Sequence, residues 1–227
     1  MHYTNKFAPA GVAVVCLAIA AGFGSGRALA ESGDRDLVYL KQGWSADERQ
    51  DFYYLTQGSQ LVPYAWFLAL EQADSQELFR TNSHLERLGY LSQRPHAQRN
   101  PDGLPIGFTK DDNPGVSYRM KKGFLGPGYE IADYPWTNQW FGLTCAACHT
   151  NDIHVNGKVI RIDGAPPLID HETLLAELAA ALSATNADNE KFTRFAKRLG
   201  EAAGLKEDLE AYTETIVNSV KRNKADS

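Results

Sequence analysis

Two cysteines and a histidine stand close enough together in this 227-residue chain to bind a cofactor. The run Cys145-Ala146-Ala147-Cys148-His149 places two thiols three residues apart, with an imidazole directly after the second. In a helical turn both thiols lie on one face and the histidine follows near it. In an exported protein this spacing is the attachment signature of c-type haem, in which the thiols form thioethers and the histidine ligates the iron. The motif therefore predicts one haem c, bound through Cys145 and Cys148, with His149 as the proximal iron ligand.

Other uses of a close cysteine pair fit this chain less well. A zinc site needs two more ligands, and the remaining cysteine, Cys16, lies in a segment that we expect to be removed. A thioredoxin-type pair needs a βαβ context, which the flanking residues do not supply. A structural disulfide across only three residues is also unusual. Haem attachment is the interpretation that the two cysteines favour.

Residues 1–30 have the features of a secretory signal peptide. Lys6 supplies a positive charge, residues 8–21 form an apolar run, and Ala28-Leu29-Ala30 offers a small-x-small cleavage pattern. The run is shorter than the ~20 apolar residues that span a bilayer, so cleavage after Ala30 is favoured over a retained anchor. We therefore expect a periplasmic or secreted protein, formed by residues 31–227 as a single domain, with no membrane attachment after cleavage.

The charge balance restricts the partners. The full chain carries a net charge of −5, and removal of Lys6 and Arg27 with the signal makes it two units more negative. An acidic balance argues against nucleic acid and against an anionic membrane surface. It suits small molecules and a redox partner protein.

Local patterns predict a mainly α fold. The expected elements are helices over 45–58, 63–72 and 76–88, an irregular loop over 92–135 that wraps the haem, a β hairpin around Asn156-Gly157, and three helices within 170–222. Six prolines in the loop argue against long regular elements there. These patterns predict a cytochrome c-like haem domain with a small β hairpin and a long haem-wrapping loop.

The sixth iron position has two candidate protein ligands. Met120 is the one methionine after the initiator, and His171 begins a helix on its apolar stripe. His154 lies too soon after His149 to reach the opposite haem face, and His84 and His96 have no distinguishing context. An open position is the remaining option, and it would favour oxygen or ligand chemistry over plain electron transfer.

Large apolar residues precede the motif, and two prolines lie further along the chain. The aromatic and aliphatic side chains of Trp136, Trp140, Phe141 and Leu143 could cover the porphyrin or could be ordinary core residues. A carbonyl of Pro166 or Pro167 could accept a hydrogen bond from Nδ1 of His149, or these prolines could simply stiffen the start of the next helix.

Several segments resemble the amino-terminal haem part of the rubber-oxygenase-like dihaem c-type cytochromes, which are distantly related to bacterial dihaem cytochrome c peroxidases. The resemblance covers about residues 48–183. It is carried by the haem motif and by the segments Leu55–Glu71, Leu104–Phe108, Gly142–Thr144 and Ile160–Gly164. Members of the family carry a second Cys-x-x-Cys-His motif, and this sequence has none. The resemblance therefore implies a truncated or divergent relative, or one piece of a split protein.

Two functions follow as expectations. The first is an exported c-type cytochrome with one covalent haem that acts in electron transfer with a redox partner protein or a second haem-bearing chain. The alternative is a haem-dependent oxygenase or peroxidase that binds O2 or peroxide at an open distal iron site. The residues do not decide whether the chain is an enzyme, and they assign no catalytic residue.

Overall fold

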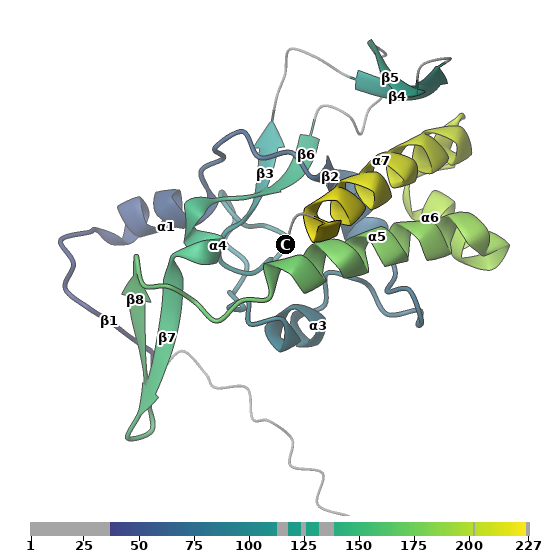
Figure 1. Ribbon diagram of the computed structural model, residues 1–227. Coiled ribbons are helices and arrows are strands. Elements are labelled where there is room, and N and C mark those ends of the chain that lie inside the picture. Colours follow the sequence, from purple (N-terminus) through teal and green to yellow (C-terminus); the bar gives the residue numbers. More distant parts are fainter. Residues whose placement is uncertain (1–36, 113–117, 124–125, 132–138, 202, 226–227) are drawn as a thin grey trace, which may run out of the picture. The chain divides into compact units, whose positions relative to one another are not determined.

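The computed structural model describes residues 37–112, 118–123, 126–131, 139–201 and 203–225, with side chains described except in 118–131 and 223–225. The expected signal peptide, residues 1–30, lies outside these ranges. The described elements, in chain order (Figure 1), are β1 (Leu37–Tyr39), α1 (Ala46–Tyr54), β2 (Val62–Pro63), α2 (Tyr64–Ala69), α3 (Asn82–Arg87), β3 (Phe108–Asp112), β4 (Tyr118–Gly123), β5 (Gly126–Ile131), β6 (Gln139–Leu143), α4 (Cys145–Cys148), β7 (Thr150–Val155), β8 (Lys158–Asp163), α5 (His171–Ala187), α6 (Asn189–Arg198) and α7 (Leu205–Ala225).

The fold is mixed α/β, so the predicted mainly α, cytochrome c-like fold is wrong. The strands form two three-stranded sheets, β1-β8-β7 and β2-β6-β3, and the two-stranded sheet β4-β5. The predicted irregular stretch, 92–135, contains β3, β4 and β5. Strand formation depends on pairing with distant segments, and local proline and glycine content does not reveal those partners.

The sheet β2-β6-β3 carries an aromatic core. Its central strand, β6, is antiparallel to both neighbours. Phe141 of β6 stacks on Phe67 of α2, with ring centroids 3.7 Å apart, and Phe108 of β3 lies against both rings. Trp140 is also buried in this core. Trp140 and Phe141 thus fill the core, while Trp136 lies outside the described residues.

The predicted hairpin around Asn156-Gly157 is confirmed. These two residues have φ of 48° and 75°, the left-handed values that a type I′ turn requires. They join β7 to β8, and β1 pairs in parallel with β8 on the other side. Asp152 accepts two hydrogen bonds of 2.7 Å from Arg161, a bidentate pair across the hairpin.

The first helix starts where the sequence predicts it. Ser45 and Glu48 form a capping box, in which each side chain accepts a hydrogen bond from the other residue's backbone amide. However, α1 ends at Tyr54, and Gly58 is not its terminator.

The second and third helices are shorter than predicted. α2 ends at Ala69, and α3 begins at Asn82 rather than at residue 76. Between them the chain doubles back, and Glu71 and Leu78 pair in an isolated antiparallel bridge. This tertiary pairing takes residues on both sides of the turn out of helical conformation.

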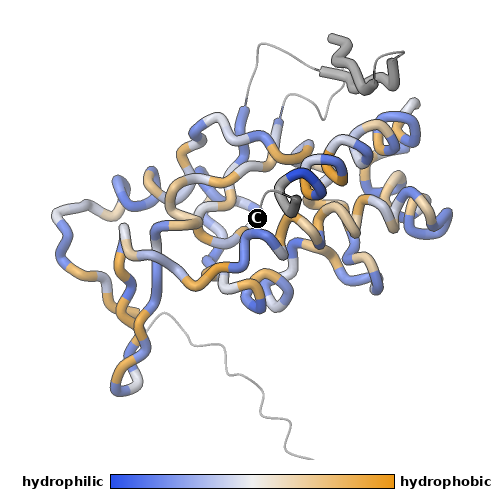
Figure 2. Tube along the Cα trace, viewed as in Figure 1, coloured by the Kyte–Doolittle hydropathy of each residue, from blue (hydrophilic) through white to orange (hydrophobic). Residues whose placement is uncertain are grey.

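The three carboxy-terminal helices are confirmed. Asp170 caps α5 by accepting a hydrogen bond of 2.9 Å from the amide of Thr173. Gly200, with φ of 79°, follows the end of α6. Apolar residues recur between polar ones along α5 and α7 (Figure 2), and the two helices pack against each other. The spacing of apolar residues was sufficient to predict these helices, because each helix buries one apolar stripe.

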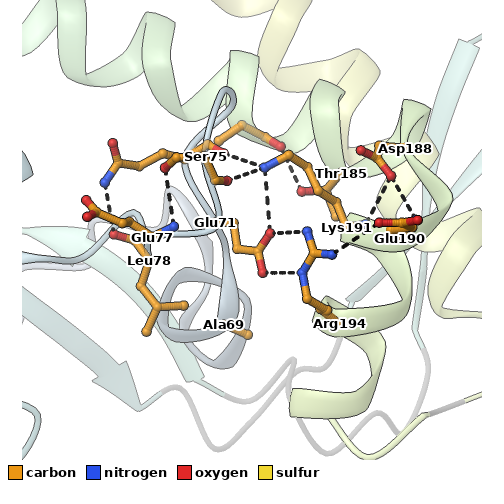
Figure 3. A network of polar contacts seen from close by, with 12 residues as sticks. Ala69, Glu71, Ser75, Glu77, Leu78, Thr185, Asp188, Glu190, Lys191 and Arg194 are labelled. Atoms are coloured by element: carbon orange, nitrogen blue, oxygen red, sulfur yellow. Dashed lines mark hydrogen bonds and ion pairs between the residues drawn. The ribbon is translucent and has the colours of Figure 1, made fainter.

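The buried carboxylate of Glu71 connects the Glu71–Leu78 bridge, which follows α2, to helix α6. Glu71, 3% exposed, accepts two hydrogen bonds of 2.8 Å from Arg194 and one of 2.8 Å from Arg198. Lys191 lies 3.6 Å from the same carboxylate and also donates to the carbonyl of Gln72 (Figure 3). These contacts lower the pKa of Glu71 to about 2, and the hydrogen bonds from Arg194 have the largest effect. Burial acts in the opposite direction and raises the pKa, but by less.

Candidate functional site

The two cysteines lie in α4, the short turn that directly connects β6 to β7. Thr144 is its N-cap, and the Oγ1 atom accepts a hydrogen bond of 3.2 Å from the amide of Ala146. The same hydroxyl donates to the carbonyl of Tyr53 at 3.0 Å, and the Thr144 amide donates to the carbonyl of Gly107 at 2.8 Å. The start of the turn is therefore attached to α1 and to the segment before β3.

The inner face of the turn is tightly packed. Ala146 and Ala147 are 1% and 4% exposed. A Cβ atom at Gly107 would overlap the backbone of Ala147, and the φ of Gly107 is 83°, so glycine is required there. Gly142 is equally close to the backbone of Ser59. Gly107 thus lets the cysteine turn pack closely against the segment before β3, and Gly142 does the same for β6 and Ser59.

The outer face of the turn carries the reactive groups. Cys145 and Cys148 are exposed free thiols, and His149, the C-cap residue, is exposed beside them. The Cys145 thiol donates to Oε1 of Gln57 at 2.9 Å. Partial desolvation, and after it the neighbouring Cys145, raises the pKa of the Cys148 thiol. Two free thiols and an imidazole thus project from one helical turn.

A connector, residues 164–170, links the motif to α5. At its start, the Gly164 amide donates to the carbonyl of His149 at 2.7 Å. At its end, the Asp170 amide donates to the carbonyl of Leu88 at 2.8 Å. In between, the carbonyl of Pro166, a predicted partner of His149, accepts a hydrogen bond of 3.0 Å from the side-chain amide of Asn151. The connector is thus held at both ends.

Tyr90 and His171 meet beside this connector. The Tyr90 hydroxyl lies 3.4 Å from Nδ1 of His171, which is half-buried at the first position of α5. The Tyr90 ring is buried edge-on against Phe108, with centroids 4.7 Å apart. Burial first, and then the charges of Cys148 and Asp170, raises the pKa of Tyr90. Tyr90 is therefore a neutral phenol near both Cys148 and His171.

The other histidines are arranged differently. His84 is buried, with Nε2 2.7 Å from the Glu177 carboxylate. His154 is exposed on β7, and Nδ1 of His96 accepts a hydrogen bond of 3.4 Å from the Arg99 amide. Met120 pairs with Tyr129 between β4 and β5, and its side chain lies outside the described residues.

A second polar cluster supports the strand that ends beside His149. The carboxylate of Asp163, at the end of β8, accepts hydrogen bonds from Arg49 at 2.8 Å and from Tyr53 at 2.6 Å. Arg49 and Tyr53 are four residues apart on α1, so they share one face of that helix. Sequence reasoning did not identify this cluster or Tyr90. Their only sequence signal was that Asp163 lies in a segment of the family resemblance.

Two further results concern metal and membrane binding. Within the described ranges, no three His, Cys, Asp or Glu side chains converge as metal ligands would. A haem iron does not need such a cluster, because the porphyrin supplies four ligands and the protein supplies the axial ones. None of the helices described is long and apolar enough to cross a membrane.

Comparison with known proteins adds one relative. The chain is 30% identical over 166 residues to the uncharacterized protein y4iJ of Sinorhizobium fredii (strain NBRC 101917 / NGR234). The match covers 70% of this chain and 26% of the relative, so the chain spans about a quarter of that protein's length. No family model matches the chain. No solved structure matches it either.

Proposed function

We propose that this chain is an exported c-type cytochrome that binds one haem c covalently and acts in electron transfer. The observation that carries the proposal is the outer face of α4. One helical turn presents two exposed, unpaired thiols, and His149 follows immediately. A purely structural cysteine pair would be buried or joined in a disulfide. When bound, a haem at this site would supply a one-electron Fe(III)/Fe(II) couple.

The residues present fit haem attachment. Each cysteine S–H would add across one vinyl C=C, with sulfur bonding to one carbon and hydrogen to the other, so no external oxidant or reductant is consumed. Both thiols are free for this step. Leu55 and Leu168, 65% and 90% exposed, lie in the segments that contact Cys145 and His149 and supply apolar surface for a macrocycle.

The scaffold would hold the proximal ligand in place. His149 follows a turn anchored through Thr144, and its carbonyl is tied to Gly164. Gly164 directly follows Asp163, which Arg49 and Tyr53 hold. Such support on both sides limits movement of the His149 backbone, which favours a constant iron geometry and rapid electron transfer.

Export and family membership are parts of the same proposal. A signal peptide over residues 1–30 would deliver the chain to the periplasm or outside the cell, where c-type haem is attached. The proposal includes the resemblance to rubber-oxygenase-like dihaem cytochromes, whose matching segments contain Gly107, Thr144 and Gly164, three residues that contact the cysteine turn. The partner in electron transfer would be a redox protein or a second haem-bearing chain.

The resemblance to these cytochromes also implies a second candidate function, in which an open iron site would bind O2 or peroxide as in a haem-dependent oxygenase or peroxidase. This candidate requires that no side chain fills the sixth position. It therefore differs from the first in one measurable property, the coordination of the iron.

Covalent haem is tested by exporting the full chain in a host that attaches c-type haem. We expect the purified protein to retain haem after denaturation and to gain the mass of one haem. Cys145→Ala with Cys148→Ala should abolish both signals, whereas Gln57→Ala, which removes only a hydrogen bond to Cys145, should keep them. A folded, exported wild-type chain with two free thiols and no haem would contradict the proposal.

A further inference from the structure

We infer that His171 is the second axial ligand of the haem iron, binding through Nε2, and that Tyr90 positions its imidazole. This inference rests on the proposed haem attachment and assigns the ligand opposite His149. Its basis is the set of contacts that join the cysteine motif, the connector and the start of α5.

The connector brings His171 to the motif. At its first residue, the Gly164 amide donates a hydrogen bond to the His149 carbonyl. At its last residue, the Asp170 amide donates to the Leu88 carbonyl, and His171 follows directly. Its middle is held by the contact between Pro166 and Asn151, and the backbone of Leu168 lies against Gly89. Two adjacent prolines restrict it further. A short, restrained connector therefore limits how far His171 can lie from the His149 carbonyl.

Tyr90 orients the imidazole. The hydroxyl lies at Nδ1 of His171, and among the described residues no partner lies at Nε2. An axial histidine commonly uses one ring nitrogen for the metal and donates a hydrogen bond from the other. With Nε2 on iron, the Nδ1–H would donate to the Tyr90 oxygen. The Tyr90 ring packs against Phe108, with centroids 4.7 Å apart, and Gly107, the residue before Phe108, contacts Ala147 of the cysteine turn. The pair therefore lies beside the segment that supports the attachment site.

The other histidines are placed less favourably. His84 is buried and already bound to Glu177. His154 lies in β7, only five residues after His149 and on the hairpin that leads away from α4 (Figure 1). The amide of Arg99 occupies one nitrogen of His96. Among the described histidines, His171 combines a ring nitrogen without a partner with a connector whose first residue, Gly164, contacts His149.

A histidine at both axial positions would give a six-coordinate, low-spin iron. Such a site transfers electrons but has no open position for O2 or peroxide. The inference therefore favours electron transfer over the oxygenase or peroxidase candidate.

The test uses the full chain with its haem attached. The ferric wild-type protein should be low-spin by absorption and electron paramagnetic resonance, with a near-infrared band of two nitrogen ligands, and should not bind cyanide or CO readily. His171→Ala should become high-spin and bind both ligands, and added imidazole should restore the low-spin spectrum. His154→Ala, the matched control, should match the wild type.

Tyr90→Phe tests the positioning role. It should keep a low-spin iron but raise the midpoint potential, because loss of the hydrogen-bond acceptor makes the His171 ring a weaker donor. An unchanged potential overturns the role of Tyr90.

The two proposals fail in different ways. A haem-bearing wild type that is high-spin, or that has the sulfur-ligand band expected of Met120, overturns only the assignment of His171. A haem-bearing His171→Ala protein that stays low-spin does the same. A folded chain without covalent haem overturns the proposed function, and the assignment with it.

Discussion

Gly107 lies directly against the backbone of Ala147, in the middle of the turn that carries the two cysteines. Its carbonyl also accepts the hydrogen bond from the Thr144 amide, at 2.8 Å. The segment before β3 is thus the support on which the cysteine turn rests.

Gly107→Ala should displace the cysteine turn. The added methyl group meets Ala147, and the φ of 83° is unfavourable for alanine, so we expect a loss of at least about 2 kcal/mol in the free energy of unfolding. Urea unfolding of the purified chain measures this loss. Gly164→Ala is the matched control, because its φ is 86° but a Cβ atom there meets nothing within 4 Å. Equal losses in both variants would show that the contact with Ala147 is unimportant.

Asp163→Asn should destabilise the protein by about 3 kcal/mol, because it leaves the buried Arg49 guanidinium without its counter-charge. Tyr53→Phe removes only a hydrogen bond of 2.6 Å to the same carboxylate and should cost about 1 kcal/mol. Asp51 lies on the same helix as Arg49 and Tyr53 and makes a half-exposed pair with Arg99, so Asp51→Asn should cost less than about 1 kcal/mol. Thermal and urea unfolding rank the three, and a different order would contradict the role of Asp163.

Glu71 should make stability depend on pH below its ordinary pKa. Folding lowers that pKa from 4.5 to about 2, so the ionised group contributes about 3 kcal/mol that is fully present above pH 4.5. The contribution is lost as the pH falls from 4.5 towards 2. The difference in unfolding free energy between wild type and Glu71→Gln should shrink over that range.

Glu190→Gln is the control for this prediction. Glu190 contacts the same Arg194 at 3.9 Å, but its side chain is 88% exposed. It should change stability little at any pH between 2 and 7. A gap between wild type and Glu71→Gln that stays constant from pH 7 to 2 would argue against a buried, ionised Glu71.

The sequence by itself determined the features that depend on neighbouring residues. The Ser45–Glu48 capping box, the Asn156-Gly157 turn and the Asp170 cap each need only residues a few positions apart. The same holds for α4, whose outward thiols follow from the spacing of Cys145 and Cys148. Local backbone preferences and side-chain periodicity are sufficient for such features.

The tertiary structure alone decided what joins distant segments. It paired β6 with β2 and with β3, a strand inside the stretch that was predicted to be irregular. It also shortened α2 and α3, because Glu71 and Leu78 pair in a bridge between them. It also brought Tyr90 to His171, 81 residues away in the chain. Such contacts depend on packing and strand pairing between segments whose local sequences carry no sign of one another. The sequence thus predicted the cysteine turn, whereas the fold determined which residues support that turn and which imidazole lies at Tyr90.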